Sequence, residues 1–403
     1  HTAMQKGLVC SAYALGGKGL SEAAAKMAFG NGFGFAFDES NTDISLFAPA
    51  YGDLVLEVEE GSLSKLEEIG ISYTLAGTVT DNKSFTYKNS KVDFESALKA
   101  WEDTLEEVFP TRTAHEEKDI VLPLYDSHTV YTAGKKVARP SVFIPVFPGT
   151  NCEYDLLRAF EKAGANVVTK VFKNRDEKDI KESVLEFEKA IKESNMIMFP
   201  GGFSAGDEPD GSGKFIATVF RNPRLSDAVN DLLKNKDGLV LGICNGFQAL
   251  IKLGLVPYGE ITAQTEDSPT LTINKIGHHV STSVYTKVVT NKSPWLSMAE
   301  LGGVYTIPAS HGEGRFVAND EWLKKLIAGG QVATQYVDLK GNPTMDDAFN
   351  PNGSYLAIEG ITSPDGRVLG KMAHSERIGE GVAENIYGKY DQKLFEAGVN
   401  YFK

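Results

Sequence analysis

The stretch GLVLGICNGFQALIKLG, residues 238–254, decides the fold of this chain. Its first half is apolar and predicts a buried strand that ends at Ile243, while its second half has the spacing of a helix. Cys244 stands between the two, and Gly246 allows the backbone to turn sharply there. A cysteine on such a turn is held at the end of the strand, next to a helix N-terminus that favours its thiolate. The pattern therefore predicts a nucleophilic thiol at Cys244.

A lone cysteine in an apolar strand is more commonly structural, and this alternative has to be weighed. The complete Gly-x-Cys-x-Gly pattern at residues 242–246 favours catalysis, because small residues on both sides permit a strained turn. Cys10 and Cys152 lack this context. We interpret both as structural.

A second glycine-rich loop, FPGGFSAGDEPDGSG at residues 199–213, follows the apolar run NMIMF. It could be a plain tight turn. We favour the alternative that Gly201 and Gly202 bring a backbone N–H to the position of an oxyanion, because both loops end strands of the same sheet. Asn245 and Gln248, directly after the predicted nucleophile, complete the predicted oxyanion and substrate-binding group.

From Pro140 onward, apolar runs alternate with helical patterns. Four of these runs are too continuously apolar to have a solvent-exposed face, and each is connected to the next through a helix. They cover residues 141–147, 166–172, 195–199 and 238–243. The expected fold is α/β, with a mostly parallel, flavodoxin-like sheet covered on both sides. Such a sheet places its ligand site at the carboxyl ends of its strands.

Residues 1–109 predict a smaller α+β domain, with helices expected over 21–30 and 93–109 and short strands between them. Residues 110–139 are polar and without a sustained period, so we expect a surface linker there. The α/β domain then covers 140–403. Because the chain begins with His1 instead of Met, we expect it to be cut from a longer polypeptide.

The composition excludes several classes of protein. The chain has 403 residues, 42% of them hydrophobic and 24% charged, which is typical of a globular protein. A formal charge of -13 repels a phosphate backbone and argues against a nucleic-acid partner. The three cysteines show no zinc or disulfide spacing, and no residue cluster has metal-ligand spacing. We expect no metal, no membrane segment and a cytoplasmic location.

Five motifs, in chain order, resemble the class I glutamine amidotransferase domain of phosphoribosylformylglycinamidine synthase. They are FPGTNCE (147–153), FPGGFSAGD (199–207), GICNGFQ (242–248), SHGEGRF (310–316) and AHSER (373–377). Residues 1–109 resemble the C-terminal lobe of the AIR-synthetase-like domain that precedes the amidotransferase domain in the long form of that enzyme. The resemblance thus extends over most of the chain.

The resemblance implies a Cys-His-Glu triad, carried here by Cys244, His374 and Glu376. His311 and Glu313 form a second His-x-Glu pair, and both pairs follow apolar runs, so local pattern alone does not separate them. The resemblance favours His374 and leaves His311 in a substrate-side or interdomain loop. Ser375 stands where the family commonly has Pro, which leaves the conformation of this loop open.

The other histidines are assigned no catalytic role. We interpret His278 and His279 as surface residues or as supports of the site. His115 and His128 fall in the expected linker and are interpreted as solvated.

The resemblance also implies a reaction. L-glutamine is hydrolysed, and the ammonia serves the ATP-dependent conversion of formylglycinamide ribonucleotide to formylglycinamidine ribonucleotide. Ammonia protonates in water, so a sheltered route to the synthetase site is implied. The glutaminase domain needs no cofactor, whereas ATP and Mg²⁺ belong to a synthetase portion expected upstream, which is also the expected partner.

Three alternatives remain open at this stage. A different cysteine hydrolase on the same superfold is disfavoured, because such relatives often place His directly after the nucleophile, where this chain has Asn245. A non-catalytic regulatory module is disfavoured because nucleophile, base and carboxylate candidates are all present. The glycine-rich stretch at 7–37 could bind a phosphate or simply pack a helix, and the acidic HDxSDGG pattern of related lobes is absent from it.

Overall fold

The computed structural model describes residues 1–40, 45–114, 120, 122–206, 212–379 and 381–403. The chain divides into two compact units, His1–Thr111 and Arg112–Lys403. The expected boundary near residue 109 lies beside this division. The expected linker does not stand free, however, because residues 112–139 belong to the second unit.

Backbone contacts explain why the expected linker packs on the second unit. Tyr125 N donates to Val289 O at 2.8 Å, and Val137 N donates to Phe402 O at 2.7 Å. Ile120 and Ala133 are buried in the large hydrophobic core. A polar segment without periodicity can therefore still follow a sheet and a helix closely, because its backbone groups find partners there.

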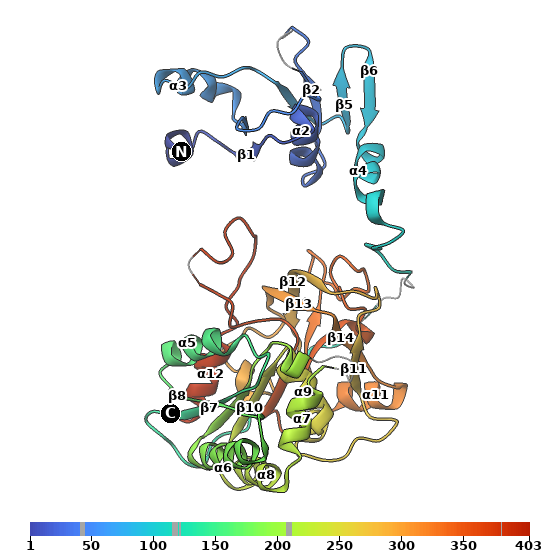
Figure 1. The fold of residues 1–403 in the computed structure, drawn as a ribbon. Helices are drawn as coiled ribbons and strands as arrows, with labels where there is room; N and C mark the ends of the chain where they lie inside the picture. Colours follow the sequence, from blue (N-terminus) through green and yellow to red (C-terminus); the bar gives the residue numbers. More distant parts are fainter. Residues whose placement is uncertain (41–44, 115–119, 121, 207–211, 380) are drawn as a thin grey trace. The chain divides into compact units, whose positions relative to one another are not determined.

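The first unit is a small α+β fold (Figure 1). Its four-stranded sheet has the order β4-β2-β5-β6, and β1 pairs with β3. The elements are α1 (Thr2–Gln5), β1 (Ser11–Ala14), α2 (Gly19–Phe29), β2 (Gly34–Phe37), β3 (Leu54–Glu57), α3 (Leu63–Glu68), β4 (Gly77–Thr80), β5 (Ser84–Tyr87), β6 (Ser90–Asp93) and α4 (Phe94–Glu102).

One local feature of this unit differs from the expectations, and another supports one of the two alternatives for the glycine-rich stretch. The helix expected over 93–109 ends at Glu102, where the Thr104 hydroxyl bonds to the carbonyls of Ala100 and Trp101 and competes with the helix. In the glycine-rich stretch, a Cβ on Gly19 would lie 2.4 Å from Ala48 O. This glycine therefore serves close packing at the start of α2.

The second unit is built on a nine-stranded sheet of order β13-β12-β15-β16-β17-β10-β9-β7-β8. Its elements are β7 (Ser141–Val146), α5 (Glu153–Ala163), β8 (Asn166–Val171), α6 (Glu177–Glu193), β9 (Met196–Phe199), α7 (Lys214–Phe220), α8 (Pro223–Asn235), β10 (Leu239–Ile243), α9 (Asn245–Leu253), α10 (Leu255–Tyr258), β11 (Thr270–Ile273), β12 (Val280–Val288), β13 (Val304–His311), β14 (Glu313–Val317), α11 (Asp320–Ala328), β15 (Val332–Tyr336), β16 (Ile358–Thr362), β17 (Val368–Lys371) and α12 (Leu394–Tyr401).

One half of this sheet has the flavodoxin-like arrangement that the sequence predicts. Strands β8, β7, β9, β10 and β17 are mutually parallel, in the 2-1-3-4-5 order of doubly wound folds. Helices α5 and α12 pack together on one face, and α6, α7, α8 and α9 cover the other (Figure 1). Antiparallel strands β16, β15, β12 and β13 extend the sheet, an extension that the alternation of runs and helices does not predict.

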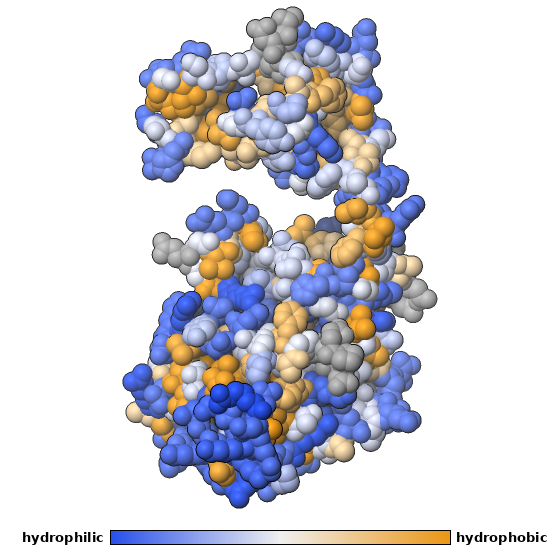
Figure 2. All heavy atoms as spheres, in the orientation of Figure 1, coloured by the Kyte–Doolittle hydropathy of each residue, from blue (hydrophilic) through white to orange (hydrophobic). Residues whose placement is uncertain are grey.

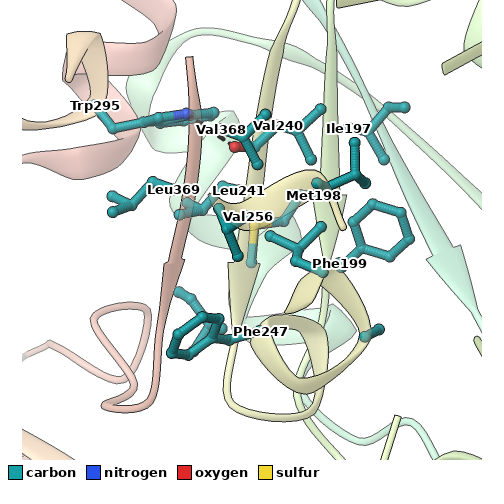
Figure 3. Packing of buried hydrophobic residues seen from close by; sticks show 14 of the residues in the cluster. Ile197, Met198, Phe199, Val240, Leu241, Phe247, Val256, Trp295, Val368 and Leu369 are labelled. Carbon is teal, nitrogen blue, oxygen red and sulfur yellow. Dashed lines mark hydrogen bonds between the residues drawn. The ribbon is translucent and has the colours of Figure 1, made fainter. Parts of the chain in front are cut away.

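The parallel strands are buried because helices lie on both faces. Figure 3 shows side chains of β9, β10 and β17 packed with Phe247 of α9 and Val256 of α10. The indole N–H of Trp295 donates to Val240 O at 3.1 Å, which satisfies the polar atom of a fully buried ring. This packing fixes the strand ends that carry the site.

The surface over α6 and α8 is mostly hydrophilic (Figure 2). Helix α6 carries Lys–Glu pairs one turn apart, such as Lys181 with Glu177 at 2.7 Å and Lys192 with Glu188 at 2.6 Å. Exposed pairs of this kind contribute only a few tenths of a kcal/mol each.

Within the described residues, no helix combines the length and the apolar character that crossing a membrane requires.

Four loops meet at the carboxyl ends of the parallel strands. They follow β7 (147–152), β9 (200–206), β10 (the turn at Cys244) and β17 (372–377). Adjacent parallel strands end at the same edge, so segments far apart in the sequence become neighbours there. The candidate site lies at this edge.

Candidate active site

Cys244 occupies the turn between β10 and α9. Its backbone has φ 54° and ψ −110°, a conformation that is strained for a residue with a side chain. The Cys244 N–H donates to Lys371 O at 2.9 Å and its carbonyl accepts from Gln248 N at 3.0 Å, so both neighbours hold the turn. Its side chain is almost buried, and a Cβ on Gly246 would lie 2.0 Å from Phe199 O. A glycine is thus sterically required at position 246.

His374 and Glu376 follow β17 and form a buried pair. His374 Nδ1 lies 2.6 Å from Glu376 Oε1, and the two residues are 2% and 4% exposed. Burial lowers the pKa of His374, but the Glu376 carboxylate and the thiol of Cys244 raise it more, so the pKa lies well above its ordinary value. In return, His374 holds the pKa of Glu376 below its ordinary value despite burial. The pair favours an imidazolium.

Gly201, at the end of β9, brings the predicted residues together. A Cβ at this position would lie 2.9 Å from His374 Cε1, 3.0 Å from Cys152 Sγ and 3.5 Å from Cys244 Cβ. Side chains from the ends of β7, β10 and β17 therefore converge on one glycine. No larger residue fits without moving the histidine or a thiol.

Gly202 has φ +137°, and a Cβ there would lie 2.6 Å from Gly149 O. Asn245 connects this loop to α9, because its Oδ1 accepts from Ser204 N at 3.3 Å. Its Nδ2 donates to Gln248 Oε1 at 2.9 Å. These contacts fix the backbone that is predicted to stabilise an oxyanion, a role that stays a prediction.

Gln248 and Glu313 are turned toward each other. Gln248 Nε2 donates to the Glu313 carbonyl oxygen, so the Gln248 amide is engaged within the protein. The Glu313 carboxylate accepts from Ser212 N at 2.7 Å and lies 3.8 Å from Lys252 Nζ. It therefore points to α9 and the loop after β9, away from His311.

His311, the last residue of β13, has a different environment from His374. Its Nδ1 lies 3.3 Å from Asn274 Oδ1, and its buried Nε2 has no hydrogen-bond partner among the described residues. Burial, followed by the charge of His374, lowers the pKa of His311 to about 3. Asn274 can orient this imidazole, but a pKa of about 3 makes it a weak base, and no carboxylate stabilises its cation as Glu376 does for His374. The geometry favours His374 for this role.

Cys152 lies inside the site, although the sequence predicts only a structural cysteine. Its Sγ is 3.8 Å from His374 Nδ1 and accepts from Arg377 Nη2 at 3.2 Å. Cys152 precedes α5 without the glycine-flanked turn that marks Cys244, so the local sequence pattern does not indicate that it belongs to the site. Its place in FPGTNCE, directly after an apolar strand, is the signal that could have found it.

Cys152, His374 and Glu376 also offer ligand atoms within 4.8 Å of one another, a grouping that could in principle hold a metal ion. The imidazole and carboxylate are, however, bonded to each other at 2.6 Å, and a guanidinium faces the thiol. These contacts compete with metal coordination. The arrangement instead suits proton transfer.

His279 is connected to Cys244 through one intervening residue. His279 Nε2 is 2.9 Å from Ser310 Oγ, and the carbonyl of Ser310 lies 3.7 Å from Cys244 Sγ. His279 thus contacts a residue that touches the nucleophile, as the interpretation of a supporting residue predicts. His128 is exposed, and His115 lies outside the described residues.

A parallel sheet whose β10 ends in a cysteine turn, with a histidine–carboxylate pair at the end of β17, is the arrangement that the resemblance to class I glutamine amidotransferases implies. The model of the CobB/CobQ-like glutamine amidotransferase domain matches residues 139–402. With the relatives described next, this shows that the chain belongs to the phosphoribosylformylglycinamidine synthase family of glutamine amidotransferases. The family and the fold expected from the motifs are confirmed.

Two relatives illustrate the match. Phosphoribosylformylglycinamidine synthase subunit PurQ of Methanococcus maripaludis is 32% identical over 284 residues, covering 66% of this chain and 95% of the relative. The probable chloroplastic/mitochondrial phosphoribosylformylglycinamidine synthase of Arabidopsis thaliana is 28% identical over 400 residues, covering 92% of this chain and 28% of the relative. The second alignment extends into the first unit.

Among solved structures, PurLQS from Thermotoga maritima matches with 27% identity and a TM-score of 0.47. The match covers 66% of this chain and 100% of that chain.

Proposed function

We propose that this chain hydrolyses L-glutamine at Cys244 and supplies ammonia for the ATP-dependent conversion of formylglycinamide ribonucleotide to formylglycinamidine ribonucleotide. One observation carries the proposal. His374 is held by a buried carboxylate at 2.6 Å and meets the Cys244 side chain across Gly201. A thiol, an oriented imidazole and a carboxylate are the groups that covalent acyl transfer requires.

The proposed reaction proceeds in two halves. The Cys244 thiolate attacks the carboxamide carbon of glutamine, and the N–H groups of Asn245 and Gly202 stabilise the oxyanion. His374 gives its proton to the departing ammonia, which leaves a glutamyl thioester on the sulfur. The imidazole then takes a proton from water, and the resulting hydroxide equivalent attacks the thioester. Glutamate is released, and the Cys244 thiolate and the protonated His374 are restored.

The charges around His374 support this sequence of proton transfers. The raised pKa keeps the imidazole protonated, so that it can act as the acid in the first half. Glu376 fixes the other nitrogen and stabilises the cation whenever it forms. His311 stays neutral because its pKa is lowered to about 3, so it does not compete for this proton.

The proposed partner is a synthetase portion or subunit that binds ATP and Mg²⁺. The name of a relative supports it, because PurQ is described as a subunit of the synthase. Ammonia would reach that partner by a sheltered route. The proposed compartment is the cytoplasm, in line with three cysteines that form no disulfide.

The experiment is glutamate release from glutamine by the purified chain, combined with labelling by a glutamine-derived diazoketone. We expect hydrolysis, and one label per chain on Cys244. Cys244→Ser should abolish both, whereas Cys10→Ser, a change at an exposed cysteine in the other unit, should alter neither. Hydrolysis by the Cys244→Ser variant, or labelling at Cys10 or Cys152, would overturn the proposal.

A further inference from the structure

A fully buried lysine lies directly behind the candidate site. Lys371, the last residue of β17, is 0% exposed and is paired with Glu359 of β16, which is 1% exposed. Taking an ammonium and a carboxylate out of water is costly, and apolar residues would serve an interior strand better. The charges in this position call for an explanation beyond packing.

All three protons of the Lys371 ammonium have acceptors. Nζ donates to Ala373 O at 2.7 Å and to Ser375 Oγ at 3.0 Å, and it lies 3.3 Å from Glu359 Oε1. The first two acceptors belong to the residues immediately before and after His374. One cation thus holds the histidine loop on both sides.

The same residue also holds the nucleophile. The Lys371 carbonyl accepts from Cys244 N at 2.9 Å, at the strained turn before α9. Lys371 is therefore bonded through its main chain to the thiol residue and through its side chain to the loop of the imidazole. The relative position of the two reacting groups depends on it.

Neighbouring side chains anchor this network to the sheet. Glu359 Oε1 accepts from Ala373 N at 2.7 Å, and its Oε2 accepts from the hydroxyl of Thr334. Ser375 Oγ donates to Gln392 Oε1 at 2.7 Å. The loop after β17 is thus tied to the antiparallel half of the sheet and to the segment before α12.

We propose that Lys371, neutralised by Glu359, is a positioning residue that holds the loop of residues 372–376 so that His374 faces Cys244. The inference rests on the proposed glutaminase function and names a residue that it requires. It also accounts for Ser375: its hydroxyl accepts from Lys371, a bond that a proline could not make.

The test measures the rate of Cys244 alkylation by iodoacetamide against pH, by mass spectrometry on the whole chain. A thiolate paired with an imidazolium reacts at pH 6, where an isolated thiol of pKa about 8.5 is protonated. We expect Lys371→Met to slow the reaction at pH 6 at least about tenfold and to leave it unchanged at pH 9.5, where either thiol is ionised. Ser375→Ala, a milder change, should show the same effect in reduced form.

A double variant separates positioning from stability. Lys371→Met alone leaves Glu359 buried without its cation and should lower the thermal midpoint. Lys371→Met combined with Glu359→Gln removes both charges and should recover the midpoint, yet its reaction at pH 6 should stay slow. Recovery of both the midpoint and the reaction rate would overturn the inference.

Arg367→Met is the matched control. Arg367 is 8% exposed, is paired with Asp365 at 2.7 Å and precedes the opposite end of β17. Its loss should lower the midpoint without changing the pH profile, and an equal loss of reactivity would overturn the inference. Glutamate release by the wild-type chain tests the proposed function separately. If Cys244 of the wild-type chain is alkylated as expected but no glutamate is released, the proposed glutaminase function is rejected and the positioning role of Lys371 is not.

Discussion

At the scale of single residues, the two histidines near Cys244 differ in charge and orientation. His374 carries a buried carboxylate on Nδ1, while His311 faces an amide oxygen and has a pKa lowered to about 3. Removing either changes the surroundings of the thiol. Only one of them is placed to move a proton.

We expect His374→Ala to lower the rate of glutamine hydrolysis at least about a hundredfold, the usual scale of general acid–base catalysis. His311→Ala should lose less and should act mainly on KM. Steady-state kinetics of both purified variants provide the measurement. Equal losses, or a larger loss for His311→Ala, would transfer the proton-transfer role to His311.

His311 should also make the fold sensitive to acid. Its folded pKa of about 3 lies below its ordinary value of 6.5, so the unfolded chain binds a proton first as the pH falls. The contribution of neutral His311 to the free energy of unfolding is therefore fully present above pH 6.5. It is lost as the pH falls toward 3, by about 1.4 kcal/mol per pH unit. In urea unfolding at pH 7, 6 and 5, His311→Gln should lose stability less steeply than wild type. Parallel slopes would contradict the assignment.

At the scale of elements, the site depends on how closely the loops after β9, β10 and β17 approach one another. Gly201 is the point of contact, because a Cβ there would meet His374 Cε1 at 2.9 Å and Cys152 Sγ at 3.0 Å. Both neighbours are buried, so neither can withdraw into solvent.

We expect Gly201→Ala to reduce glutamine hydrolysis at least about tenfold while the protein stays folded, because displacing the imidazole by part of an ångström misaligns proton transfer. Gly312→Ala is the matched control in the β13–β14 turn, since its Cβ would lie no closer than 3.8 Å to any neighbour. Kinetics and circular dichroism of both variants test this expectation. An unchanged hydrolysis rate in Gly201→Ala would show that the three loops can accommodate a methyl group without displacing His374.

At the scale of the whole molecule, every described contact of the candidate site comes from the second unit. The segment 112–139 belongs to that unit and is bonded to it at Val289 and Phe402. The boundary that matters for stability is therefore near residue 111 and not near 139.

We expect a chain shortened to residues 112–403 to alkylate at Cys244 at the wild-type rate. A chain shortened to 140–403 loses three backbone hydrogen bonds, made by Tyr125 and Val137, and the burial of Ile120 and Ala133. Its thermal midpoint should fall by at least about 5 °C. Calorimetry of both chains gives the comparison. Identical midpoints would show that the segment is only a surface connection.

The sequence by itself predicted what depends on neighbouring residues. The β10–α9 turn at Cys244 could be recognised because burial of a strand, a glycine turn and helical spacing all act within residues 238–254. The same holds for the alternation of strands and helices after Pro140, and the motifs identified the family. The antiparallel extension of the sheet was missed, because pairing partners are set by non-local register.

Only the tertiary structure decided which groups share the site. Glu313 is two residues from His311, as Glu376 is from His374, yet Glu313 bonds to Ser212 N whereas Glu376 holds its histidine. Cys152 and Lys371 reach the site because parallel strands end at one edge, whatever their separation in the chain. Side-chain direction at a strand end follows from the packing of the whole sheet, and a local pattern does not contain that information.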